Sequence, residues 1–168
     1  MSTGAEPRPP VPEDNGAIAT LWHQGWHDAH LGLVPEPLIA ARTLASFEDR
    51  VAGYSAEMRV VGPLGRPLGF QMVKGSEVYQ FFVAREARGT GVAARLMRDA
   101  EAQLAAAGQT AAWIACVVGN ERAARFYEKE GWSCDREKRT SYDVESIAGP
   151  IAVTIWRFEK TFEPRRPE

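Results

Sequence analysis

The sequence predicts a single α/β domain in which helices pack on a mixed central sheet, and three observations support this fold class. The chain has 168 residues, which suits one domain with one hydrophobic core. Runs of β-branched and aromatic residues alternate with segments whose apolar residues recur at helical spacing. No internal repeat or interdomain linker interrupts this alternation.

The N-terminal half is expected to hold two helices and then three strands. Residues 12–14, a proline followed by two acids, favour the first turn of a helix. The apolar face of this first helix comprises Ile18, Leu21, Trp22 and Trp26. The other elements are a helix over about 38–52, with Ile39, Leu44, Phe47 and Val51 as its apolar stripe, and strands over 58–61, 68–73 and 78–83.

In the C-terminal half, glycines mark where helices begin and end. One helix follows Gly91 and closes at Gly108, and a second runs from Asn120 to Gly131, with a strand around 110–118 between them. Two long strands are expected over 133–144 and 151–162. The resulting order is α-α-β-β-β-α-β-α-β-β. The domain should span residues 13–162, with flexible segments at 1–12, which carries four prolines, and at 163–168.

Composition limits the classes of partner. The formal net charge is -2 and 25% of residues are charged, so nothing indicates nucleic acid or an anionic membrane surface. No apolar run approaches the roughly 20 residues of a membrane span, and the N-terminus does not resemble a signal peptide. Cys116 and Cys134 do not form a disulfide framework. We therefore expect a cytoplasmic protein.

The most informative stretch is Arg88-Gly89-Thr90-Gly91-Val92-Ala93, between the predicted 78–83 strand and the following helix. Such a turn leaves backbone N–H groups free at the helix N-terminus, where the helix dipole also attracts anions. Glycine lets a phosphate approach closely because it has no Cβ. The segment predicts a site for a phosphate-bearing cofactor.

Two known phosphate-binding patterns fit this stretch poorly. Residues 89–94 match G-x-G-x-x-A, but a dinucleotide site expects an acidic residue about 20 positions later, and residues 110–118 contain none. A P-loop needs Lys-Ser or Lys-Thr after the glycines, and neither follows here.

A third pattern fits both halves of the region. Residues 88–93 resemble Arg/Gln-x-x-Gly-x-Gly/Ala, the pyrophosphate loop of the GNAT N-acetyltransferase superfamily. Residues 120–132, from Asn120 through Phe126 and Tyr127 to Gly131 and Trp132, resemble the family's Asn-x-x-Ala-x-x-Phe-Tyr-x-x-x-Gly-Phe/Trp segment. The resemblance covers residues 77–132. It implies a single GNAT-like domain with about six or seven strands, a splayed pair of strands and about four helices.

The resemblance also implies acetyl-CoA as co-substrate, with no metal. The pantetheine arm would lie between the strands over 77–84 and 111–118, with backbone hydrogen bonds from Val83. The N–H groups of Gly89, Thr90, Gly91, Val92 and Ala93 would hold the pyrophosphate, and Arg88 would add charge. Asn120 has two compatible roles: helix N-cap, and a hydrogen bond to the pantetheine.

Catalysis would depend on an acid and a base. The resemblance makes Tyr127 the general acid, because a phenol can protonate the departing thiolate. Many family members carry a glutamate where this chain has Gln80, which cannot accept a proton. Glu77 is the alternative base if a bulge resets the strand's alternation, and His27 or His30 are further candidates.

Several other residues have a structural and a chemical interpretation. His23, His27 and His30 share one helical face, which suits a solvated or substrate-facing stripe better than a zinc site. Trp22 and Trp26 suit the core, or else stacking on an acceptor. Cys116 is interpreted as a small core hydrophobe, with an acyl-cysteine relay as the alternative.

The leading hypothesis is an N-acetyltransferase that moves the acetyl group from acetyl-CoA to a primary amine by direct attack in a ternary complex. The acceptor is a small molecule or a peptide amine; a polyamine and a basic peptide both remain open. The rival, which Gln80 keeps open, is a non-catalytic acyl-CoA-binding sensor or partner-binding module. Dimers are common in the family, so a homodimer is one expectation.

Overall fold

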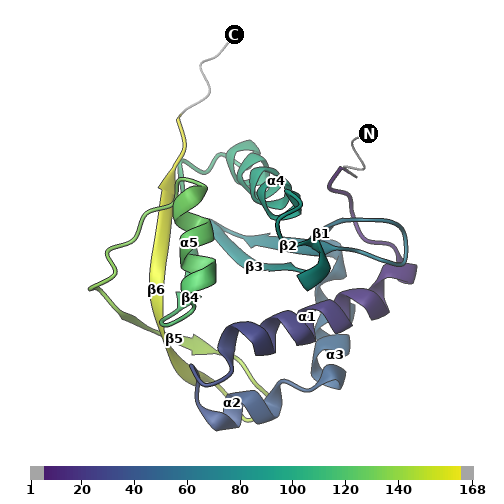
Figure 1. Cartoon of the computed structure of the whole chain (residues 1–168), viewed down its shortest axis with the longest axis horizontal. Helices are drawn as coiled ribbons and strands as arrows, with labels where there is room; N and C mark the ends of the chain where they lie inside the picture. Colours follow the sequence, from purple (N-terminus) through teal and green to yellow (C-terminus); the bar gives the residue numbers. More distant parts are fainter. Residues whose placement is uncertain (1–5, 164–168) are drawn as a thin grey trace.

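A computed structural model describes residues 6–163 of the chain, in which a six-stranded sheet lies between two helical layers (Figure 1). The predicted flexible ends at 1–12 and 163–168 lie partly outside these residues, and both domain boundaries stay predictions. The helices are α1 (Asn15–His30), α2 (Glu36–Ala41), α3 (Leu44–Tyr54), α4 (Val92–Ala106) and α5 (Glu121–Lys129). The strands are β1 (Met58–Val61), β2 (Gly69–Lys74), β3 (Glu77–Val83), β4 (Ala111–Val117), β5 (Thr140–Val144) and β6 (Ile151–Thr161).

The sheet order is β1-β2-β3-β4-β6-β5, and only β3 and β4 run parallel. The predicted fold class, a mixed α/β sheet with a splayed strand pair, is confirmed. On one face, α1 and α3 pack through the fully buried Trp22 and Phe47. On the other face, α4 and α5 pack through Met97 and Ala124 onto the fully buried Phe158 of β6. Both layers are held by apolar burial, the dominant favourable contribution to folding.

The predicted helix over 38–52 is wrong in one respect, because two helices cover this segment. The backbone leaves helical geometry at Arg42, with φ -88° and ψ 63°. Thr43 then caps α3 by accepting a hydrogen bond from the Ser46 N–H at 3.1 Å. A side-chain cap starts a new helix and competes with continuation of the old one. Leu44, expected in the apolar stripe, is 41% exposed.

The predicted strand over 133–144 is also too long. Only β5 pairs with β6 in this segment, apart from an isolated bridge between Ser133 and Glu159. The intervening residues form a turn, in which the Lys138 N–H bonds the Asp135 carbonyl at 3.0 Å. Arg136 then reaches back to α5 and pairs with Glu121 and Glu128, at 3.0 and 2.8 Å. These ion pairs hold the charged residues of this segment against α5 instead of in the sheet.

A buried carboxylate anchors the start of the domain to the β1–β2 turn. The side chain of Asp14 is fully buried and pairs with Arg8 at 2.8 Å. It also accepts hydrogen bonds from the Val11 and Gly65 N–H groups, each at 2.8 Å. The Arg8 hydrogen bond, opposed by burial and aided by the two backbone donors, lowers the pKa of Asp14 to about 2.

Candidate active site

The central feature of the sheet is the gap between β3 and β4. These parallel strands share one register pair, Glu77 with Trp113, together with a bond from the Trp113 N–H to the Ser76 carbonyl at 3.0 Å. Beyond this point the described residues form no further pair between the two strands. A cavity of about 1290 Å³ occupies the opening, lined by residues 78–83 of β3 and 114–117 of β4. The facing edges of β3 and β4 therefore have unpaired backbone groups that a ligand in the cavity can bond.

The glycine turn lies at one end of this cavity. Gly89 and Gly91 have φ values of 77° and 88°, a region that only glycine enters cheaply. Gly91 is the N-cap of α4. Within residues 6–163, the N–H groups of Gly91, Val92, Ala93 and Ala94 have no recorded acceptor. Four free donors at the start of a 15-residue helix can bind an anion.

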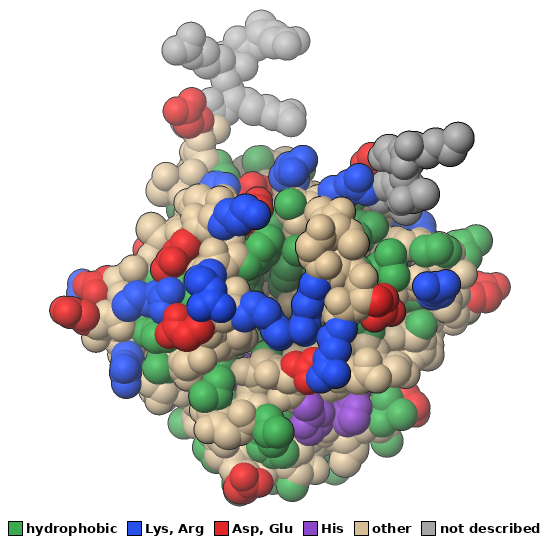
Figure 2. Space-filling model, viewed as in Figure 1, with side chains coloured by type: hydrophobic (Ala, Val, Ile, Leu, Met, Phe, Trp, Pro, Cys, Tyr) green, Lys and Arg blue, Asp and Glu red, His purple; other side chains and the backbone are tan. Residues whose placement is uncertain are grey.

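Arginines surround the turn. Arg88 lines the cavity and lies 3.6 Å from Asp28 of α1, which also pairs with Arg85. Arg122 of α5 lines the same opening, and burial, then repulsion from Arg88, lowers its pKa. One carboxylate thus faces three guanidinium groups, which leaves positive charge for a polyphosphate. Figure 2 shows basic side chains gathered across the middle of this face.

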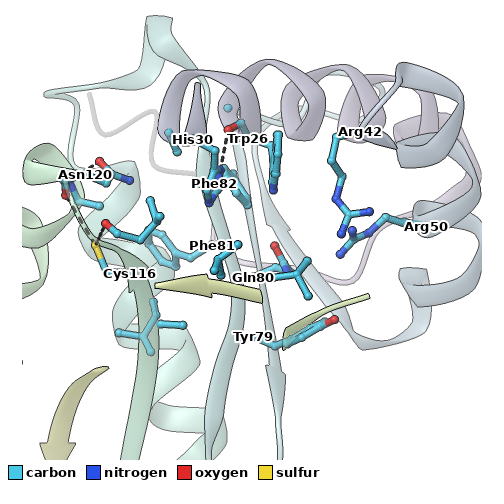
Figure 3. A pocket seen from close by; sticks show the side chains of 18 of the residues that line it. Trp26, His30, Arg42, Arg50, Tyr79, Gln80, Phe81, Phe82, Cys116 and Asn120 are labelled. Atoms are coloured by element: carbon cyan, nitrogen blue, oxygen red, sulfur yellow. Dashed lines mark hydrogen bonds between the residues drawn. The ribbon is translucent and has the colours of Figure 1, made fainter. Parts of the chain in front are cut away.

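Asn120 caps α5, which is the structural role considered for it. Its Oδ1 accepts a hydrogen bond from the Ala123 N–H at 3.3 Å. The residue also lines the cavity, so its amide NH₂ is within the same space as the β3–β4 edges (Figure 3). The structure therefore leaves room for both predicted roles of Asn120.

Tyr127 is packed on one side and open to the cavity on the other. Its ring is 5.4 Å from that of Phe158 and 5.8 Å from that of Phe126, and the residue is 7% exposed. It lines the cavity, and among the described residues none hydrogen-bonds its hydroxyl. Burial raises the pKa of Tyr127, so the phenol keeps its proton across the whole working pH range. Tyr127 is thus a proton or hydrogen-bond donor without a protein partner.

A bulge in β3 determines what Glu77 and Gln80 can do. Met72 pairs with Gln80 while the next residue, Val73, pairs with Val78, so one β3 residue is extra. An extra residue resets the alternation of side chains along a strand. Glu77, Tyr79 and Gln80 consequently all line the same cavity. The Tyr142 hydroxyl donates to Glu77 at 3.3 Å, but burial is the larger influence and raises the pKa of Glu77.

A sequence model described as "Acetyltransferase (GNAT) family" matches residues 10–132. The chain belongs to the GNAT acetyltransferase family. A search of curated proteins finds no match. Among solved structures, the fold is similar to a GCN5-related N-acetyltransferase from Rhodopseudomonas palustris, with TM-score 0.69 and 24% identity over 96% of this chain and 98% of that one.

Two further neighbours were solved with a coenzyme. One is the PaiA N-acetyltransferase of Thermoplasma acidophilum in complex with coenzyme A, with TM-score 0.65 and 14% identity over 94% and 98% of the two chains. The other is YncA, a putative acetyltransferase of Salmonella typhimurium, with acetyl-CoA, with TM-score 0.67 and 13% identity over 99% of both chains. At these identities the likeness concerns the fold of the GNAT domain.

The three histidines of this GNAT domain are half-buried: each packs against an aromatic ring, Figure 2 shows histidine side chains at the surface, and His30 also lines the cavity. His30 stacks on Trp26 at 4.4 Å and donates Nδ1–H to the Trp26 carbonyl at 2.7 Å. Burial lowers the pKa of His30 to about 4, which leaves it neutral and weakly basic. His27 Nε2 is bonded to the Arg42 carbonyl at 2.8 Å. Neither is well suited to act as the general base.

The remaining sequence alternatives are decided by burial. Trp22 is fully buried and Trp26 is 5% exposed, and both belong to the core, although Trp26 also lines the cavity. Cys116 is buried, and burial raises the pKa of its thiol to about 12. A thiol that keeps its proton is a poor nucleophile, which supports its interpretation as a small core residue.

Sequence reasoning missed the wall of the cavity opposite the glycine turn. Arg42, Arg50, Lys74 and Tyr79 all line it. Isolated arginines near amphipathic helices ordinarily face solvent, so nothing in the sequence marked them. Within residues 6–163, no group of three His, Cys, Asp or Glu side chains is arranged to hold a metal ion, and no helix is long and apolar enough to cross a membrane.

Proposed function

We propose that the protein is an N-acetyltransferase that transfers an acetyl group from acetyl-CoA to a primary amine by direct attack in a ternary complex. One observation carries the proposal: a single cavity brings together free N–H donors at a glycine turn, an unpartnered buried phenol and a half-buried carboxylate. Family membership supports acyl transfer as the reaction class. The two neighbours solved with coenzyme A or acetyl-CoA support the choice of donor.

The residues at the glycine turn fit a diphosphate. The N–H groups of Gly91, Val92 and Ala93 at the start of α4 would hold it, and Arg88 and Arg122 add two positive charges. The unpaired edges of β3 and β4, with Val83 and the amide of Asn120, would receive the pantetheine amides as an added strand. Of the other two predicted cofactor residues, Gly89 lines the cavity, whereas the Thr90 N–H already bonds the Ala87 carbonyl at 3.2 Å and is not available to the diphosphate.

Bound acetyl-CoA supplies an activated acyl thioester. Tyr127 would donate a hydrogen bond to the sulfur as the C–S bond breaks and the amine nitrogen forms the new C–N bond. A phenol is a weaker acid than a thiol, and burial raises the pKa of Tyr127 further, so Tyr127 stabilises the departing thiolate as a hydrogen-bond donor and keeps its own proton.

Four carboxylates of the described residues line the cavity, and Glu77 is the one that is not exposed; the others are Asp49, Asp143 and Glu145. An ammonium must lose a proton before its nitrogen can attack, and a carboxylate with a raised pKa is a stronger base than an exposed one. Gln80, on the same side of the bulged strand, can orient the amine or a water but cannot accept the proton. We therefore assign Glu77 the base role and Gln80 a positioning role.

The second candidate is a non-catalytic acyl-CoA-binding module, which the glutamine at position 80 favours. Two assays on the purified protein distinguish the enzyme from the binding module. Thiol release from acetyl-CoA across a panel of amines, at pH 6 to 10, is expected for the enzyme. Tight coenzyme A binding by calorimetry, without thiol release on any amine, would instead establish the binding module.

A further inference from the structure

The acceptor side of the cavity contains two arginines without a counter-charge. Arg42 is 4% exposed and Arg50 is half-buried, and both line the cavity. In Figure 3 their side chains, from the end of α2 and from α3, extend toward one another. Within residues 6–163, neither forms an ion pair with a carboxylate, and the Nε of each has no hydrogen-bond partner.

The contacts that these arginines do make hold them in place without neutralising them. Arg42 donates from Nη2 to the Glu145 carbonyl at 2.6 Å. Arg50 lies over the Trp22 ring at 4.7 Å, a cation–π contact that orients the guanidinium. A carbonyl and an indole face leave both charges uncompensated. Burial and then the neighbouring Arg50 lower the pKa of Arg42 to about 10, which expresses this repulsion and still leaves the guanidinium charged at neutral pH.

Two buried cations facing each other are costly unless an anion joins them. An arginine presents a planar fork of N–H donors that matches an oxyanion, and both side chains line the cavity. Lys74, which lies over the Tyr79 ring at 4.6 Å, adds a third cation along the same wall. The wall therefore has the charge of an oxyanion site.

A carboxylate, Glu77 of β3, also lines this cavity and lies directly across from Lys74 of β2. Glu77 lies in the same cavity with its bond from Tyr142, and it is the group that an ammonium would meet. Tyr79 lines the same cavity; burial raises the pKa of its phenol, Arg50 lowers it and Glu77 raises it. The cavity thus offers a negative group for an amine and a positive pair for an acid.

We propose that the amine acceptor is zwitterionic, with an anionic group, a carboxylate or a phosphonate, bound by Arg42 and Arg50 while its amine is presented toward Glu77. This inference rests on the proposed function and adds the class of its acceptor. It disfavours the polyamine and the basic peptide that composition alone left open, because a further cation would be repelled by the arginine pair.

The test compares matched acceptors. Thiol release is measured for α-amino acids, their α-carboxamides, aminoalkylphosphonates and a polyamine, with wild type, Arg50→Gln, Arg50→Lys and Arg98→Gln. Arg98 is exposed on α4 and serves as the matched control. We expect wild type to prefer an amino acid to its carboxamide by roughly 100-fold in kcat/KM, because an unfilled arginine pair rejects a neutral group.

In Arg50→Gln the preference for the amino acid should fall roughly tenfold or more, mainly because KM for the amino acid rises. Arg50→Lys should recover part of the preference, and Arg98→Gln should keep it unchanged. Equal use of acid and carboxamide by wild type, or preference for the polyamine, overturns the proposal while leaving acetyl transfer intact. The phosphonate arm identifies which oxyanion is preferred. If no amine supports thiol release, acetyl transfer fails, and calorimetry of amino acids with coenzyme A present decides the anion site separately: binding that Arg50→Gln weakens supports it, and no binding refutes it.

Discussion

Replacing Tyr127 by phenylalanine isolates the proposed hydrogen-bond donor from the fold. The ring makes its contacts with Phe126 and Phe158 through carbon, at centroid distances of 5.8 and 5.4 Å, and phenylalanine retains them. Only the hydroxyl is lost, and among the described residues it has no hydrogen-bond partner. Removing a polar group without a partner costs a fold almost nothing. The free energy of unfolding should change by less than about 1 kcal/mol.

The effect on catalysis should be much larger. A hydrogen-bond donor positioned on a developing negative charge contributes at least about 10²-fold to a rate, which corresponds to roughly 2.7 kcal/mol of barrier. We expect kcat to fall by at least about 100-fold, while the affinity for acetyl-CoA changes little, because Tyr127 is not among the residues proposed to hold the diphosphate or the pantetheine amides.

The assay is thiol release under saturating acetyl-CoA, with affinity measured by calorimetry and stability by thermal denaturation. Tyr54→Phe is the matched control, since Tyr54 lines the same cavity away from the glycine turn; its kcat should stay near that of wild type. If Tyr127→Phe retains full turnover, the phenol does not stabilise the thiolate and the mechanism above is refuted.

Three further predictions follow from the same structure. Asp14→Asn should lower the free energy of unfolding by about 2 kcal/mol at pH 7, because the pKa of Asp14 in the folded protein, about 2, lies below the usual 3.8. Wild type should lose this advantage over the variant as the pH falls from about 4 to 2. Urea denaturation measures the difference, and an unchanged difference at pH 2 would contradict the prediction. Gly91→Ala should weaken acetyl-CoA binding roughly tenfold, since φ 88° strains alanine at the N-cap, and calorimetry checks this. Glu77→Gln should lower kcat and remove the acidic limb of the pH profile of kcat. In wild type this limb is expected above pH 4.5, because burial raises the pKa of Glu77. If the limb is unaltered in the variant, another group is the base.

The glycine turn and the cap of α5 could be predicted from sequence because their determinants are local. Gly89 and Gly91 mark positive φ, and Asn120 marks a helix start, whatever surrounds them. The β3 bulge could be suspected but not assigned, since its position depends on pairing with β2.

The failures concern residues whose contacts are distant in sequence. The sequence pattern predicts a strand after Ser133, but ion pairs hold Arg136 of this segment against α5, and the strand that pairs with β6 begins only at Thr140. Arg42 is bonded to a carbonyl 103 positions away, and no local pattern encodes such a contact. Propensity and periodicity describe neighbours along the chain, so tertiary contacts of this kind override them.

The hydrogen bond from Arg42 to the Glu145 carbonyl joins the part of the chain that the family model matches to the part that follows it. Glu145 directly follows β5, beyond residue 132 where the family match ends, whereas the glycine turn, Tyr127 and Glu77 all lie within it. The residues proposed to handle the thioester thus lie inside the matched segment, whereas the hairpin of β5 and β6 lies outside it. Exchanging that hairpin would remove the carbonyl that holds Arg42 and the hydroxyl that bonds Glu77, and it would leave the glycine turn in place.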